Sequence, residues 1–148
     1  MNRISYADQY RAALRYAAAT VAAYAAEHDS QSRPVNRESR LYHRIACYLT
    51  RLTTGRTSTC GHLQIGPQPL HAALWSPGRL VCSACLHQLR PATALEDSTC
   101  DACRRLVTTI HPTVVPLGLI VLSLGLCPRC LPATTHPTHP APEEETAR

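Results

Sequence analysis

Apolar residues in the first part of the chain recur at helical spacing. Between residues 5 and 28 they return every three or four positions, which places them on one face of a helix at about 100° per residue. Ser5 and Asp8 have the spacing of a capping box at the start of this segment. Residues 5–28 are therefore predicted to form an amphipathic helix. Its apolar stripe would consist of Tyr6, Tyr10, Leu14, Ala17, Val21 and Tyr24.

A second helix is predicted from Arg37 to Thr53, after a linker of turn-forming residues. Asn36 is placed to be its N-cap, and Gly55 is placed to end it. The simplest arrangement of two such helices is a helical hairpin over residues 1–56. The apolar arc of the second helix comprises Leu41, Ile45, Tyr48, Leu49 and Leu52.

From residue 57 the helical periodicity ends and strand-like segments follow. Leu70 to Val81 is expected to form a β-hairpin, because its Ser-Pro-Gly sequence at 76–78 suits a tight turn. Val114 to Leu126 is apolar at both odd and even positions, which point to opposite faces of a strand, so it must be covered on both faces. Residues 132–148 are rich in Pro and Glu and are expected to be a disordered tail. The pattern predicts an α+β protein.

Eight cysteines lie among these segments, and seven of them have metal-ligand spacing. Within each of three pairs two residues separate the cysteines, and a seventh cysteine stands two positions before a histidine. A tight turn with C-x2-C spacing presents two thiolates to one tetrahedral ion. Seven cysteines and one histidine are enough for two structural Zn²⁺ sites. The predicted ligands are Cys60, His62, Cys82, Cys85, Cys100, Cys103, Cys127 and Cys130.

The order of these ligands suggests how they are shared between two ions. A ligand pair, a strand-like segment and a second pair occur once in residues 57–92 and again in 97–131. This internal repeat favours consecutive pairing, with one zinc ion in each half. A cross-braced arrangement, in which the first pair joins the third and the second joins the fourth, is the alternative.

Over residues 58–131 these motifs resemble treble-clef and zinc-ribbon modules. The first half resembles a treble clef, in which the second ligand pair opens a short helix, here Leu86 to Arg90. The second half resembles a zinc ribbon, because a Pro-rich segment follows Cys130. The resemblance implies zinc binding but no single function, since such modules serve in nucleic-acid binding, ubiquitin transfer and scaffolding. The complete RING ligand pattern is not matched.

Other interpretations of these residues stay open. The C-x2-C pairs also suit a disulfide framework or a redox dithiol. His71, His87 or Cys47 could replace His62 as a ligand. Cys47 is otherwise expected to be a buried residue of the second helix.

The composition indicates a mild positive charge and an expected cellular location, and little else. The net charge of +5 comes from 15 Arg and no Lys; seven ligand thiolates and two zinc ions together would lower it to +2. No secretory signal pattern follows the N-terminus, and the longest apolar run is shorter than the roughly 20 residues that span a bilayer as a helix. A cytoplasmic location is expected, and membrane association is not.

No catalytic motif accompanies the predicted zinc sites. Sites closed by four ligands leave no position for substrate or water, and the sequence contains no H-E-x-x-H, P-loop or G-x-S-x-G motif. Asp101, which lies inside a ligand knuckle, is expected to form local hydrogen bonds. The sequence therefore predicts a binding protein rather than an enzyme.

Two classes of partner are considered, and nucleic acid is preferred. Four arginines of the second predicted helix fall within about 60° of one another and could contact phosphates. Trp75 and Tyr42 are the candidates for stacking on bases. A solvated helix face is the alternative. The four arginines are Arg37, Arg40, Arg44 and Arg51.

The second class is a protein-interaction adaptor. A small zinc domain has little material to cover the run Val114 to Leu126, which would leave a patch for a partner or a second copy. Burial under the N-terminal helices is the alternative. Oxidation that ejects zinc would make the chain a thiol-based sensor, but no residue singles out that role.

Overall fold

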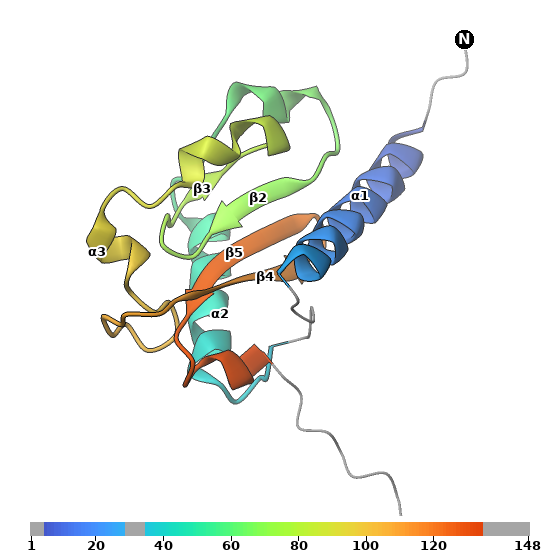
Figure 1. Cartoon of the computed structure of the whole chain (residues 1–148). Coiled ribbons are helices and arrows are strands. Elements are labelled where there is room, and N and C mark those ends of the chain that lie inside the picture. The colour runs from blue at the N-terminus through green and yellow to red at the C-terminus, as the bar shows by residue number, and fades with distance from the viewer. Residues whose placement is uncertain (1–4, 29–34, 135–148) are drawn as a thin grey trace, which may run out of the picture.

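Two long helices enclose a small sheet in the computed structural model, which describes residues 5–28 and 35–134 (Figure 1). The helices are α1 (Tyr6–Glu27) and α2 (Arg40–Thr54). The sheet has the order β2-β5-β4, with strands β2 (Leu70–Ala73), β4 (His111–Leu117) and β5 (Ile120–Leu126). The central strand β5 runs parallel to β2 and antiparallel to β4. The predicted α+β class is confirmed.

The helices are placed differently from the predicted hairpin, because each packs on the sheet. Leu41 and Ile45 of α2 belong to the main core cluster, together with Leu122 of β5. Ala17 and Val21 of α1 form a smaller cluster with Val121, whose side chain points to the other face of β5. The two helices therefore cover opposite faces of the sheet. Both faces of the apolar run must be shielded from water, and each helix shields one of them.

Helix α1 begins as predicted, but its buried stripe is shorter. The Ser5 hydroxyl accepts a hydrogen bond from the Asp8 N–H at 3.2 Å, so Ser5 is the N-cap. Ala17 and Val21 are buried as expected, whereas Tyr6 is 73% exposed and Tyr10 is 42% exposed. The clustered contacts with the sheet come from the C-terminal half of α1, so the first tyrosines have no sheet beneath them.

Helix α2 begins three residues later than predicted. Its N-cap is Ser39, whose hydroxyl accepts the Tyr42 N–H at 3.1 Å. The Asn36 side chain instead accepts the Glu38 N–H at 2.9 Å, which closes a local turn that competes with the helix. Arg37 consequently lies outside α2, contrary to the prediction. Gly55 is the C-cap, as predicted.

The predicted hairpin at residues 70–81 is present. His71 and Val81 exchange backbone hydrogen bonds of 2.7 and 3.0 Å, and Gly78 turns the chain with a φ of +77°. Its second arm contains β3 (Arg79–Leu80), which also pairs with β1 (Ser58–Thr59). Since β2 comes from the first cysteine-rich half and β5 from the second, the two halves share one sheet.

The apolar run at 114–126 forms two strands rather than one. Gly118, with a φ of +64°, reverses the chain between β4 and β5. Val115, Val121 and Leu122 are at most 4% exposed, so both faces of the run contain buried positions, although Pro116 and Gly118 are exposed. Strand β4 is one of the two edge strands of the sheet, and it carries Pro112 and Pro116. Prolines lack the N–H that an added strand would need.

The remaining elements are short. Helix α3 (Ala94–Asp97) precedes the second cysteine-rich half, and the 3₁₀ turn η3 (Leu131–Thr134) follows it. The rest of the predicted tail, residues 135–148, lies outside the described residues. Within the described segments, no helix has the length and hydropathy needed to span a membrane.

Two candidate metal centres and a basic pocket

The first candidate centre joins residues from two loops of the first half. Cys60 follows β1 and caps the 3₁₀ segment η1 (Gly61–Ile65), which carries His62. Cys82 caps a second 3₁₀ segment, η2 (Ser83–Leu89), which contains Cys85. The His62 Nδ1 lies 3.4 Å from the Cys85 Sγ and 3.8 Å from the Cys82 Sγ. The three cysteines are buried and His62 is exposed.

The second candidate centre contains four cysteines. Cys100 and Cys103 lie between α3 and β4, and Cys127 and Cys130 follow β5. The Sγ atoms of Cys103 and Cys127 are 4.0 Å apart. The eight predicted ligands thus come together in two groups, and the grouping is that of consecutive pairing rather than cross-bracing.

The distances within each group suit a tetrahedral metal site. All potential ligand atoms of a group lie within 4.8 Å of one another. Zinc–sulfur bonds of about 2.3 Å place two thiolates of a tetrahedral site roughly 3.8 Å apart. All eight cysteines are free, so the structure contains no disulfide framework. Both groups could bind zinc ions.

The two groups repeat the same backbone contacts. The first cysteine of each group accepts an N–H from the third ligand position: Cys60 from Cys82 at 3.2 Å, and Cys100 from Cys127 at 3.3 Å. The Cys85 N–H bonds the Cys82 carbonyl at 2.9 Å, and Cys130 repeats this contact with Cys127 at 2.9 Å. The internal repeat seen in the sequence is therefore also a structural repeat.

The thiols within each group differ in how readily they ionise. The backbone N–H of Cys82 lowers the pKa of Cys60 to about 7. Burial opposes ionisation of Cys100, but backbone N–H groups lower its pKa to about 7 as well. Burial and the neighbouring thiols raise the pKa of Cys85 to about 11 and that of Cys130 to about 12. Full ionisation of each group needs a positive charge at its centre, which a divalent metal supplies.

The centres differ in their relation to the core. Cys100 is fully buried and belongs, with Cys127, to the main core cluster. Cys60, Cys82 and Cys85 belong to a separate cluster. Asp101 fixes the second centre to β5: its N–H bonds the Gly125 carbonyl at 2.8 Å, and its Oδ2 accepts the Gly125 N–H at 2.7 Å. Asp101 therefore forms hydrogen bonds as expected, but to a strand 24 residues away rather than locally within its knuckle.

The surroundings of the centres correct two details of the expected modules. The predicted short helix Leu86 to Arg90 is the 3₁₀ segment η2, which begins directly after Cys82. A 3₁₀ turn also follows Cys130, where no helix was expected. The β4–β5 hairpin separates the two ligand pairs of the second half, as in a ribbon-like arrangement.

The alternative ligands lie outside both groups. His71 is buried on β2, where its Nε2 lies 3.0 Å from the Ser83 hydroxyl, and burial lowers its pKa. His87 is exposed on η2. Cys47 is exposed, contrary to the prediction, because the buried face of α2 is formed by Leu41, Ile45 and Tyr48.

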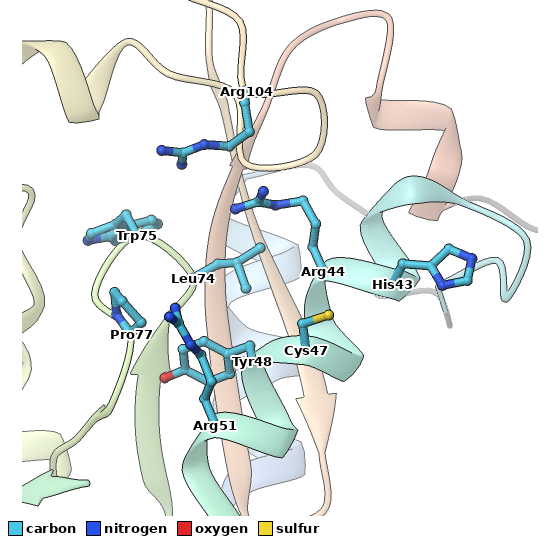
Figure 2. A pocket seen from close by; sticks show the side chains of 9 residues that line it. All are labelled: His43, Arg44, Cys47, Tyr48, Arg51, Leu74, Trp75, Pro77 and Arg104. Atoms are coloured by element: carbon cyan, nitrogen blue, oxygen red, sulfur yellow. The ribbon is translucent and has the colours of Figure 1, made fainter. Parts of the chain in front are cut away.

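Two of the four predicted arginines line a pocket of about 540 Å³ between α2 and the β2–β3 turn (Figure 2). These are Arg44 and Arg51, and Trp75 lies on the opposite wall. Arg37 and Arg40 do not line it. Arg104, which the sequence did not indicate, adds a third guanidinium. It follows the knuckle of the second centre in the left-handed conformation, with a φ of +61°.

Comparison of the chain with protein-family models, with curated proteins and with solved structures finds no match.

Proposed function

We propose that this protein is a non-catalytic, zinc-stabilised, cytoplasmic binding protein that associates with nucleic acid. The zinc-stabilised part of this proposal rests on the geometry of the two four-residue groups. Each group offers four ligand atoms within 4.8 Å of one another, which fills a tetrahedral coordination shell. A filled shell leaves no open position on the metal for substrate, so both ions serve to hold the loops together.

The basic pocket supports nucleic acid as the partner. Arg44, Arg51 and Arg104 converge on one depression, and guanidinium groups bind phosphate through paired N–H donors. The protein adaptor is the alternative function. Its expected patch, the run Val114 to Leu126, packs against both helices at its buried positions, so the pocket is the better supported surface.

Fluorescence anisotropy with single-stranded RNA and with duplex DNA tests this proposal. We expect the zinc-loaded protein to bind with a micromolar dissociation constant at low salt and to lose affinity as salt rises, because phosphate contacts release counterions. Replacing both Arg44 and Arg51 by Gln should lower the slope of log affinity against log salt by about 1.4 for a single strand, since each contact contributes about 0.7.

Arg11→Gln combined with Arg15→Gln is the matched control, because both are exposed arginines on α1, across the sheet from α2. It changes the net charge without touching the pocket, and the salt slope should stay at the wild-type value. Absence of binding to either nucleic acid at low salt would refute the proposed partner.

A further inference from the structure

The pocket beside α2 contains buried donors that have no acceptor. Tyr48 is 3% exposed, and its hydroxyl has no hydrogen-bond partner among the residues that the structure describes. The Arg44 Nε is also buried without a partner. Both residues line the pocket, and Figure 2 shows the Arg44 guanidinium directed into it. Buried polar groups in proteins are nearly always paired, so two unpaired donors on one wall indicate an acceptor-rich ligand.

Tyr48 remains a donor at every pH at which the protein would work. Burial raises the pKa of its phenol to about 12, so the proton stays on the oxygen. A phenolic O–H can donate one hydrogen bond, and a phosphate oxygen is a strong acceptor for it.

The charge of the pocket favours an anion. Three of its lining residues are arginines, and none of the nine is acidic. The carboxylate of Asp101 lies beside the pocket: its Oδ1 is 4.0 Å from the Arg104 Nη1, and both Arg44 and Arg104 attract it. One negative charge against three guanidinium groups leaves the pocket positive. His43 points away from the other side chains in Figure 2.

One wall of the pocket is apolar and suits a flat ring. It is formed by Leu74, Trp75 and Pro77 in the turn that joins β2 to β3. The Trp75 Nε1 donates a hydrogen bond of 2.7 Å to the Leu89 carbonyl, which fixes the orientation of the indole. An indole held in place beside arginines is the combination on which nucleobases stack.

We propose that this pocket binds one nucleotide. Its phosphate contacts Arg44, Arg51, Arg104 and the Tyr48 hydroxyl, and its base lies against Trp75. The cavity of about 540 Å³ falls within the range of roughly 300–1,000 Å³ that is usual for small-molecule sites. The nucleotide is either a free mononucleotide or one unit of a single strand. Only the second source rests on the proposed nucleic-acid function.

The fluorescence of Trp75 measures binding directly, because it is the only tryptophan of the chain. The zinc-loaded protein is titrated with AMP, with adenosine and with inorganic phosphate. We expect saturable quenching by AMP, and affinities for adenosine and for phosphate at least about tenfold weaker, because each makes only part of the contacts. Phosphate that competes for the pocket as well as AMP does would refute the contact of the base with Trp75.

Tyr48→Phe separates binding from folding. The substitution removes only the unpaired hydroxyl, so the melting temperature should not fall. The dissociation constant for AMP should rise about tenfold, as is usual for a hydrogen bond to a charged group. A variant that binds AMP as the wild type does would contradict the assignment of this hydroxyl.

Arg51→Gln and Arg40→Gln form a matched pair on α2, the first inside the pocket and the second outside it. We expect about a tenfold loss of AMP affinity for Arg51→Gln and no change for Arg40→Gln. An AMP affinity that Arg51→Gln leaves unchanged would refute the pocket as the nucleotide site, even if the protein binds a single strand elsewhere. AMP binding without binding of any strand would uphold the pocket and refute the proposed nucleic-acid function.

Discussion

Cys100→Ser is expected to remove one zinc ion and to abolish cooperative unfolding, whereas Cys82→Ser should remove one zinc ion and leave the main core folded. The two substitutions are chemically identical, but Cys100 belongs to the four-cysteine centre and Cys82 to the centre that contains His62. Cys100 is fully buried in the main core cluster, beside side chains of α2 and β5. Cys82 belongs to a smaller cluster with Ala73 and Val81.

The expected difference follows from the energies involved. Structural zinc contributes roughly 10–16 kcal/mol in zinc-finger peptides, and a whole domain is stable by only about 5–15 kcal/mol. The free energy lost with an ion in the main core therefore exceeds the free energy of unfolding of a whole domain. The Asp101 contacts with Gly125 transmit the loss to β5, the central strand of the sheet.

Circular dichroism during urea unfolding, with zinc counted by mass spectrometry, measures both effects. Cys47→Ser is the control, because Cys47 is exposed and lies outside both groups. This variant should keep two zinc ions and the wild-type transition. An equal loss of the unfolding transition in Cys82→Ser and Cys100→Ser would contradict the expected difference between the two centres.

Leu122→Ala is expected to lower the free energy of unfolding by about 2–5 kcal/mol. Leu122 is fully buried on the central strand β5, where it pairs with Ala72 of β2 and Val115 of β4. Its side chain packs in the same cluster as Leu41 and Ile45 of α2. Truncation leaves a cavity between the sheet and the helix that neither element can close without moving.

Leu106→Ala is the matched control for this substitution, because Leu106 is 62% exposed. Its expected effect is below about 0.5 kcal/mol. Urea denaturation of the zinc-loaded variants measures both values. A loss below about 1 kcal/mol for Leu122→Ala would mean that α2 does not pack on this face of the sheet.

Local features of the fold could be predicted because they depend on residues close in sequence. Ser5 and Gly78 have their predicted roles, which each follow from a few neighbouring residues. The grouping of ligands also follows from local spacing and from the internal repeat. The start of α2 was missed because Asn36 and Ser39 are both good caps, and only the backbone decides between them.

The arrangement of the helices depends on contacts between distant residues and could not be predicted. The sequence shows two amphipathic helices and an apolar run with two faces, but helix against helix and helix against sheet bury such surfaces equally well. Arg104 illustrates the same limit for the pocket. It follows a cysteine knuckle some 50 residues beyond α2, and only the tertiary fold brings it near Arg44.

Native mass spectrometry of the intact protein, purified under reducing conditions and without added metal, tests the central claim most directly. We predict two zinc ions per chain, both released by acid together with loss of the folded charge-state distribution. A folded, metal-free chain with its cysteines joined in disulfides would contradict the claim that two zinc centres hold this fold together.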